Sequence, residues 1–420
     1  MGQPSETIDA DVCILGGGPH GLAAAVHLRR AEPSLRLAVI DPAGDWMVGW
    51  HQQFARADIA ILRSPIVHHP ASDPDELSAF VMRTGAATSG MRYHLPVTGT
   101  FAAFCADLVQ EADLDRPVAA SATAVHPDGN GLRVTTTENA VRADHLVVAT
   151  NPHQRSIPGW VWPLLGTCPG LVVYGGDVDL RSLPDLTGER VVVIGGGLTA
   201  AHLACGAADR GAQVHLIARR PLVSRSFDTD PGWLGPKHLR AFWRDDDPES
   251  RLHTARAARG GGSVPPWMME RIAEARTAGH LHLHEGCEVR AAGIDPEGSG
   301  TLALDDHAGI RADRIWLATG SVPDVGAARC LSRLTPDVPV LDGFPITDDQ
   351  LRLGPHPVFV MGRLAMLALG PAAGNLWGAQ RAASRITDAI TGVRIGREVS
   401  GAPRPPNRAA PHRPPGHERA

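Results

Sequence analysis

The stretch Asp11-Val-Cys-Ile-Leu-Gly-Gly-Gly-Pro-His-Gly21 is an apolar run that ends in three spaced glycines, Gly16, Gly18 and Gly21. Its apolar residues predict a short buried strand over residues 8–15, and the small residues after it predict a helix. In this pattern the first glycine permits a tight turn, the second lets a phosphate approach the backbone, and the third lets the helix pack closely on the strand. The order of strand, turn and helix indicates a dinucleotide-binding site.

The residues that follow agree with this interpretation. The helix predicted to begin at Leu22 would present free N–H groups and a partial positive charge to phosphates, and Pro19 between the glycines is among the predicted contacts of the cofactor. Residues 35–40 then predict a second strand, which ends in Asp41, 25 residues past the first glycine. A carboxylate there suits a ribose with two free hydroxyl groups, so the predicted ligand is an adenine dinucleotide without a 2′-phosphate.

The same plan returns over residues 190–220, where a strand, a glycine turn, a helix and a second strand follow one another. The second strand ends in two arginines instead of an acid. Guanidinium groups hold a 2′-phosphate that a carboxylate would repel, so NADPH is expected here rather than NADH. The predicted contacts are Gly195, Gly197, Thr199, Arg219 and Arg220. The alternative is that only one arginine points inward and the other is a solvated surface charge.

One site for FAD and one for NADPH is the arrangement of two-dinucleotide-binding flavoproteins, in which FAD is held permanently and NADPH delivers hydride. Residues 144–150 and 313–320 are each an apolar strand that ends in Ala-Thr. Each resembles the Ala-Thr-Gly motif at which chains of this superfamily pass between domains. Only the second copy, with Thr319 and Gly320, is complete, because Asn151 replaces glycine in the first.

The predicted fold class is α/β, with two Rossmann-like three-layer domains and a small antiparallel β-meander between residues 118 and 150. The FAD-binding domain comprises residues 1–155 and 310–395. The NADPH-binding domain, residues 156–309, is inserted into it and carries a substrate or cap insertion near residues 221–270.

Composition limits the class of protein. The 420-residue chain is 43% hydrophobic and has a formal net charge of -5, which fits a soluble protein and argues against nucleic-acid binding. No apolar run has the length of a membrane-spanning helix, and the N-terminus lacks the features of a signal peptide, so a cytoplasmic protein without membrane contact is expected. Six scattered cysteines include no C-x-x-C pair, and no spacing indicates a metal site. The proline-rich residues 396–420 are predicted to be disordered.

Residues 50–72 resemble a region of the flavin-dependent N-hydroxylating monooxygenases (class B), which oxidise the side-chain amine of lysine or ornithine. That family has a Trp-His pair after the FAD acid, then a Leu-Lys-Asp core and a downstream Pro-x-Ser. Here Trp50-His51, Leu62-Arg63-Ser64 and Pro70-Ala71-Ser72 stand in the same order, with arginine in place of lysine.

The resemblance implies that Trp50 lies beside FAD and that Arg63 and His51 have catalytic roles. Arg63 would lie near the isoalloxazine ring and the substrate carboxylate. The alternative is that Arg63 is a structural arginine tied to Asp58 or Asp73. Both interpretations stay open at the level of sequence.

A long helix is predicted to open after residue 370, with its N-terminus near Gly374 and Asn375. An N-terminus aimed at the pyrimidine edge of the flavin would stabilise the anionic reduced form. Just before this helix, Arg363 stands where the superfamily often has an acid that contacts the ribityl chain.

The insertion near residues 221–270 belongs to neither nucleotide motif and is expected to carry substrate specificity. Asp228 and Asp230, beside Trp233, would bind the ammonium group of a substrate or, alternatively, cap helices. A glycine run over residues 260–262 predicts a mobile cap that excludes water from the reaction.

The leading functional hypothesis is an FAD-dependent, NADPH-oxidising monooxygenase. Molecular oxygen would react as a flavin C4a-hydroperoxide with a small nucleophilic substrate, with an amine or amino acid favoured. However, Leu180 stands where the wider class of flavin monooxygenases has a histidine that couples NADPH binding to oxygenation. Two alternatives therefore stay open: an NADPH-dependent dehydrogenase that passes electrons to a quinone or another carrier, and a non-catalytic flavin-binding redox sensor.

Overall fold

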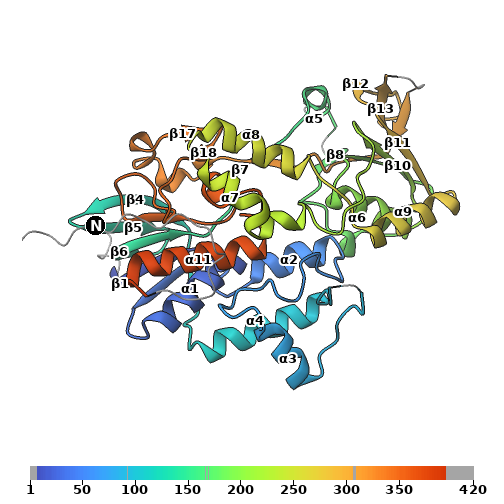
Figure 1. Cartoon of the computed structure of the whole chain (residues 1–420). Coiled ribbons are helices and arrows are strands. Elements are labelled where there is room, and N and C mark those ends of the chain that lie inside the picture. The colour runs from blue at the N-terminus through green and yellow to red at the C-terminus, as the bar shows by residue number, and fades with distance from the viewer. Residues whose placement is uncertain (1–6, 92, 166, 169, 306–308, 394–420) are drawn as a thin grey trace, which may run out of the picture.

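The computed structural model has two domains, the first built on a mixed sheet and the second on a parallel sheet, and the chain passes from the first to the second and back (Figure 1). The predicted α/β class with two Rossmann-like domains is confirmed. The structure describes residues 7–91, 93–165, 167–168, 170–305 and 309–393. The predicted disordered tail, residues 396–420, lies outside them. Within the described ranges no helix is both long and apolar enough to cross a membrane.

The sheet of the first domain has the strand order β3-β2-β1-β6-β5-β4, and β19 adds beside β6. Its strands are β1 (Thr7–Leu15), β2 (Leu37–Asp41), β3 (Val118–Ala119), β4 (Ala122–Asp128), β5 (Gly131–Thr136), β6 (Ala140–Val148) and β19 (Val358–Val360). β1 pairs in parallel with β2 and β6, whereas β4, β5 and β6 pair antiparallel, which confirms the predicted meander. β1 lies in the middle of the sheet. Its last four residues, 12–15, are all apolar and buried, as expected for a central parallel strand.

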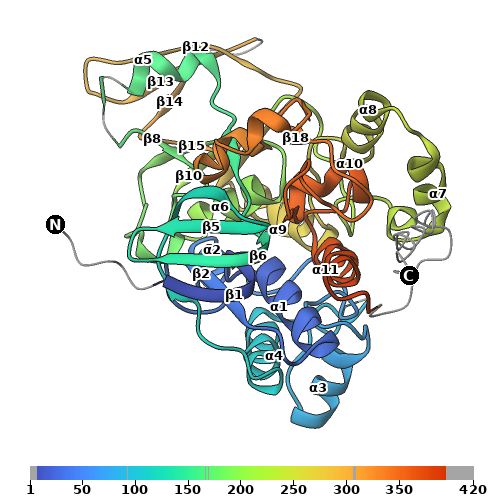
Figure 2. The same ribbon diagram turned by 90° about the vertical axis from the view of Figure 1, so that its left-hand side faces the viewer.

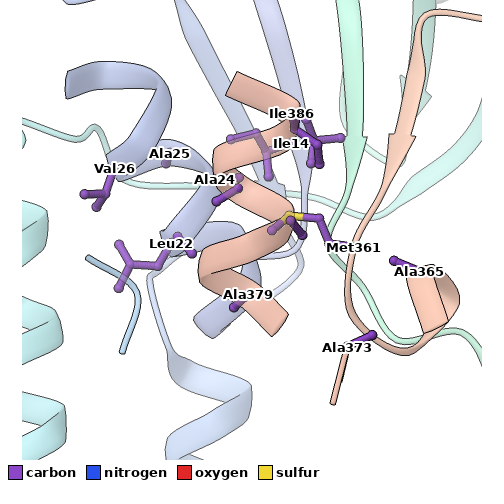
Figure 3. Close-up of a cluster of buried hydrophobic side chains, with 14 of the residues drawn as sticks. Ile14, Leu22, Ala24, Ala25, Val26, Met361, Ala365, Ala373, Ala379 and Ile386 are labelled. Carbon is purple, nitrogen blue, oxygen red and sulfur yellow. The ribbon is translucent and has the colours of Figure 1, made fainter. Parts of the chain in front are cut away.

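Two helices pack together against one face of this sheet, α1 (Pro19–Ala31) and α11 (Leu376–Thr391). Figure 3 shows that their contact is made of small side chains such as Ala24 and Ala379, with Ile14 of β1 beside them. Small residues let the two helix axes approach closely. The same layer continues in α2 (Val48–Arg56), α3 (Glu76–Thr84) and α4 (Thr98–Glu111). The other face is covered by η4 (Val325–Ala327), η5 (Arg329–Leu331) and the chain that follows them.

The second domain has a parallel sheet of order β11-β10-β9-β15-β8. Its strands are β8 (Val172–Tyr174), β9 (Arg190–Ile194), β10 (Gln213–Ala218), β11 (Leu281–Glu285) and β15 (Arg314–Leu317). The helices α6 (Leu198–Ala208) and α9 (Pro266–Thr277) pack on one face of the sheet. A small antiparallel sheet projects from this domain together with α5 (Trp162–Leu165), as Figure 2 shows. That sheet consists of β12 (Val289–Ile294), β13 (Gly300–Leu304) and β14 (Ile310–Ala312).

The boundary predicted at residue 310 is wrong. β15 pairs with β8 and β9, so residues 314–317 complete the second sheet and do not return to the first domain. The chain returns only at β16 (Ser321–Pro323), which pairs antiparallel with β7 (His153–Arg155), the strand on which the chain leaves the first domain. The two crossing segments are therefore hydrogen-bonded to each other.

The insertion folds as η3 (Pro231–Leu234), α7 (Pro236–Arg244) and α8 (Pro248–Arg259). It was expected as a mobile cap, but it is docked on the first domain at α10 (Met366–Leu369). The indole N–H of Trp243 donates to the carbonyl of Ala368 at 3.0 Å, and Arg251 donates to the carbonyl of Leu367 at 3.3 Å. An element of the second domain is thus anchored on the first.

The buried His27 of α1 makes the fold sensitive to acid. Burial lowers the pKa of His27 from its ordinary value of 6.5 to about 4. Between these pH values the unfolded chain binds a proton that the folded protein does not bind. The free energy of unfolding therefore falls as the pH is lowered from 6.5 towards 4, by up to about 1.4 kcal/mol per pH unit for one such histidine.

Chemical denaturation at a series of pH values measures this effect. The variant His27→Leu is expected to show a shallower loss of stability between pH 6.5 and 4, by the equivalent of up to about one proton. His253→Leu is the matched control, because His253 is exposed on α8. Equal slopes for the wild type and His27→Leu would contradict the prediction.

Candidate active site

The first glycine turn, between β1 and α1, has the backbone geometry that a dinucleotide needs. Gly16 has a φ of 102°, a left-handed conformation that favours glycine. A Cβ atom at Gly21 would lie 1.8 Å from the carbonyl oxygen of Gly16, so only glycine lets α1 approach the strand this closely. A Cβ atom at Gly18 would meet nothing within 4 Å, so space is open beside it. With Pro19 beginning α1, bare backbone and a helix N-terminus together fit the phosphates of a dinucleotide.

Asp41 at the end of β2 is held at this turn by two backbone groups. Its carboxylate accepts hydrogen bonds from the N–H of Gly17 at 2.8 Å and the N–H of Ala43 at 2.9 Å. A carboxylate has about four acceptor positions, so two remain for ribose hydroxyl groups. The residues present fit an adenine dinucleotide with an unphosphorylated ribose, as FAD has.

The second glycine turn, between β9 and α6, repeats the first. Gly195 has a φ of 147°, and a Cβ atom there would lie 2.3 Å from the carbonyl oxygen of Ala318. A Cβ atom at Gly197 would meet nothing within 4 Å, and Thr199 is exposed in the first turn of α6. The predicted contacts of the second nucleotide therefore lie together at one end of the second sheet.

Arg219 and Arg220 follow β10, and both are exposed. A guanidinium nitrogen of Arg220 donates weakly to the carbonyl of Gly261, at 3.4 Å. In the described part of the chain no carboxylate forms an ion pair with either arginine. Two unneutralised guanidinium groups beside the turn fit a 2′-phosphate.

Thr319 and Gly320 lie where the chain returns to the first domain. The hydroxyl of Thr319 donates to the carbonyl of Ser156, and the hydroxyl of Tyr174 donates to the carbonyl of Gly320 at 2.9 Å. The first contact joins the two crossing segments beside β7 and β16, and the second ties the returning segment to β8. The pair has a structural role here, and its predicted contact with a cofactor stays a prediction.

A cavity of about 440 Å³ lies between the two turns. Pro19 and His20 of α1, Leu198 of α6, and Gly374 and Asn375 before α11 all line it. The rest of its wall comes from the loop after α2 and from the insertion. The sites predicted for two different nucleotides therefore open into one shared space.

Arg63 lines this cavity and ties the first domain to the insertion. Its guanidinium donates to the carbonyls of Arg225 at 2.7 Å and Ser226 at 3.1 Å. It also donates to the hydroxyl of Ser263 at 2.8 Å and the carbonyl of Ser263 at 3.2 Å. Its hydrogen-bond partners are therefore not the two acids considered from the sequence. Burial lowers the pKa of Arg63 to about 10, so the group stays positively charged at neutral pH.

Asp228 is the predicted substrate residue that the fold brings to the cavity. Its carboxylate accepts a hydrogen bond from the side-chain amide of Asn375 at 3.0 Å. Its other oxygen lies 3.2 Å from a guanidinium nitrogen of Arg259, at the end of α8. A half-buried acid, an amide and a cation thus form one polar corner.

Asp230 and Trp233 do not line the cavity. Asp230 caps η3 by accepting from the N–H of Gly232 at 2.7 Å, and it lies 3.4 Å from the imidazole of His238. Trp233 packs edge-on against Phe242, with ring centroids 5.8 Å apart. Asp230 therefore caps a helix, which was the alternative to a contact with the substrate.

The two residues of the Trp-His pair have different surroundings, because one lines the cavity and the other is exposed to solvent. Trp50 lines the cavity and stacks on Phe54, with ring centroids 4.1 Å apart. The next residue on α2, His51, is exposed and is not among the cavity residues. The structure does not bring His51 to the site where a catalytic role was predicted.

Sequence reasoning missed three cavity residues with titratable side chains: His20, His68 and Arg259. Burial lowers the pKa of both His20 and His68 to about 4, so both rings are neutral at neutral pH. His20 stands inside the first glycine motif, which was a usable signal. Arg259 had none, because its place depends on how α8 docks.

Two departures from the superfamily pattern have structural explanations. Leu180 is fully buried, and a Cβ atom at Gly206 would lie 2.5 Å from its methyl group, so the glycine in α6 makes room for this leucine. Arg363 donates to the hydroxyl of Ser321 at 2.9 Å and to its carbonyl at 2.6 Å. Leu180 therefore packs in the core of the second domain, and Arg363 holds the crossing segment at Ser321.

All six cysteines are free, and Cys13 and Cys205 are buried. Burial raises the pKa of both thiols, to about 11 for Cys205. Protonated, buried thiols are poor nucleophiles, so both pack as small apolar residues. In the described ranges no group of three or more His, Cys, Asp and Glu side chains could hold a metal ion.

Solved structures share this architecture. The ornithine N-hydroxylase KtzI of Kutzneria sp. 744, solved with reduced FAD, NADP⁺ and L-ornithine, has a TM-score of 0.74 at 18% identity, covering 91% of this chain and 99% of its own. The cadaverine monooxygenase DfoA of Erwinia amylovora, bound to FAD, has a TM-score of 0.73 at 17% identity, covering 99% and 100%. At these identities the likeness shows a common fold, and it agrees with the resemblance to N-hydroxylating enzymes noted from the sequence.

The bacillithiol disulfide reductase Bdr of Bacillus cereus has a similar fold, with a TM-score of 0.59 at 19% identity. The match covers 91% of this chain and 99% of that one. No curated protein matches the chain. The family model of the pyridine nucleotide-disulphide oxidoreductases matches residues 10–234, which is more than half of the sequence. The chain belongs to the pyridine nucleotide-disulphide oxidoreductase family.

Proposed function

We propose that this protein is an FAD- and NADPH-dependent monooxygenase that N-hydroxylates a small amine. The observation that carries the proposal is the cavity that residues beside both nucleotide turns line and in which Asp228 presents a carboxylate. Solved structures of the same fold include ornithine, lysine and cadaverine hydroxylating enzymes, which supports this choice of substrate class.

The residues at the two turns would hold the cofactors. Gly16, Gly18, Gly21 and Asp41 would bind FAD, and the second turn with its two arginines would bind NADPH. Bound FAD supplies the acceptance of hydride and the activation of molecular oxygen. The chain itself binds and orients the reactants and keeps bulk water out.

Inside the cavity, Asp228 is the residue suited to an ammonium or amine group, because it is the carboxylate in the cavity wall. Arg63 acts differently, as a positioning residue. Its four hydrogen bonds hold Ser263, which lines the cavity, and residues 225–226, which lead directly into the lining residues Phe227 and Asp228. A wall held in this way is needed to keep a reactive oxygen species from premature reaction with water.

A second candidate function rests on Leu180. A buried leucine cannot supply the hydrogen bonds of the histidine that many flavin monooxygenases have at this position. An NADPH dehydrogenase that passes electrons to a quinone does not need that histidine. The two candidates differ in what happens after the flavin has been reduced.

Anaerobic reduction of the FAD-loaded protein distinguishes them. NADPH is expected to bleach the flavin at least about tenfold faster than NADH, because two guanidinium groups recognise the 2′-phosphate. Air is then admitted with L-ornithine, L-lysine or cadaverine, and hydroxylamine product is measured by mass spectrometry. Quinone reduction without hydroxylamine would favour the dehydrogenase, and absence of bleaching by either nucleotide would exclude both candidates.

The variant Asp228→Asn is expected to weaken amine binding by at least about tenfold, because it removes a charge-assisted hydrogen bond. Binding is measured by calorimetry on the FAD-loaded protein. Asp230→Asn is the matched control, because Asp230 lies outside the cavity and asparagine still caps η3. If both variants bind the amine as the wild type does, Asp228 does not recognise the substrate.

The variant Arg63→Lys is expected to loosen the cavity wall while keeping the positive charge. A lysine cannot make the four hydrogen bonds in one plane, so we expect the free energy of unfolding to fall by about 2 kcal/mol. Amide hydrogen exchange should rise over residues 224–229. Arg142→Lys, in an exposed ion pair with Asp128, is the control and should change little. Unchanged exchange over that segment would show that Arg63 does not position it.

A further inference from the structure

The glycine run over residues 260–262 has a fixed and unusual backbone. Its three residues have φ values of 61°, 80° and 109°, all left-handed. The run is pinned at both ends. The N–H of Gly260 donates to the carbonyl of Arg256 at the end of α8, and the N–H of Val264 donates to the carbonyl of Val223. The run is therefore a shaped loop between two anchors.

This loop lies against the second nucleotide turn. A Cβ atom at Gly262 would lie 3.3 Å from the Cα atom of Gly197, the residue that leaves room for a pyrophosphate. A Cβ atom at Gly261 would lie 1.9 Å from a guanidinium nitrogen of Arg220. Gly262 also lines the cavity. The loop thus runs from the arginine of the predicted 2′-phosphate site, past the turn, to the cavity.

The arginines along this path form no ion pair with a carboxylate of the described residues. Arg219, Arg220 and Arg225 are exposed, and none forms an ion pair with a carboxylate in the ranges that the structure describes. Arg225 lies on the loop side of the path, with a guanidinium nitrogen 3.6 Å from the Cβ position of Gly260. By contrast, Arg256 of the neighbouring α8 is paired with an acid. Unpaired guanidinium groups on both sides of bare backbone suit a ligand with several phosphates.

We propose that residues 260–262 form the second wall of the pyridine-nucleotide site. The pyrophosphate lies in the open space at Gly197, beside this loop, and Arg225 binds the 2′-phosphate together with Arg220. The loop carries no side chains because Gly261 lies against the guanidinium group of Arg220 and Gly262 lies against the turn, which brings the loop beside both groups that would hold the dinucleotide. This inference rests on the proposed use of NADPH and adds a coenzyme-binding segment that the nucleotide motif does not include.

Equilibrium binding of NADPH and NADH to the oxidised, FAD-loaded protein tests the loop, with calorimetry as the readout. Gly262→Ala places a methyl group 3.3 Å from the Cα atom of Gly197, against the turn that would hold the pyrophosphate, and is expected to weaken the binding of both coenzymes by about tenfold. Gly279→Ala is the matched control, because Gly279 has a similar φ of 78° and open space around its Cβ position. It introduces the same type of backbone strain outside the site.

Arg225→Ala tests the charge and does not disturb the backbone. It is expected to weaken NADPH by about tenfold and to leave NADH unchanged, because only NADPH carries the 2′-phosphate. Arg276→Ala, which removes an exposed arginine from the end of α9, is the matched control. Adenosine 2′,5′-bisphosphate, which lacks the pyrophosphate, should lose affinity in Arg225→Ala but not in Gly262→Ala.

The outcomes separate this inference from the proposed function. If the wild type binds NADPH and both test variants bind it as their controls do, residues 260–262 are not part of the nucleotide site, and the proposed function still stands. A wild type that binds neither coenzyme overturns both. Thermal unfolding of each variant accompanies the titrations, so that lost affinity is distinguished from lost folding.

Discussion

Two backbone contacts that exclude a Cβ atom determine the arrangement of the site. At the first turn Gly21 lies against the carbonyl of Gly16, and at the second Gly195 lies against the carbonyl of Ala318. Each contact holds the turn between a central strand and its helix tightly against the sheet, so that Pro19 and Leu198, in the first turns of α1 and α6, both reach the cavity. A methyl group at Gly21 or Gly195 would displace backbone, because the opposing atoms are carbonyl oxygens that cannot rotate away.

Polar contacts between the domains hold one wall of the cavity. Arg63 of the first domain binds backbone carbonyls of the insertion, and Arg259 of the insertion binds both Asp228 and the carbonyl of Pro371 in the first domain. Bonds from a guanidinium group depend strongly on direction, so they fix the position of the wall as well as its stability. The insertion is part of the second domain, and its docking on the first therefore ties the shape of the cavity to the relative position of the two domains.

The sequence predicted those features that arise from neighbouring residues. The glycine turns, Asp41 and the arginine pair follow from the order of strand, turn and helix, which is local. The partners of Arg63 could not be predicted, because they lie more than 160 residues away along the chain. His51 was assigned to the site with Trp50, but successive residues on a helix point about 100° apart, so one faces the cavity and the other faces solvent. The boundary at residue 310 failed because one apolar strand carries no information about which sheet it joins.

The electrostatics of the cavity favour the N-terminus of α11 as the group that faces an anionic reduced flavin. His20 and His68 are neutral at neutral pH, and the guanidinium groups of Arg63 and Arg259 are already directed to acceptors of the protein. Asn375 does not cap its own helix, because its side-chain amide donates to Asp228. The first N–H groups of α11 therefore have no side-chain acceptor from that residue, and with the helix dipole they supply positive potential without a mobile charge.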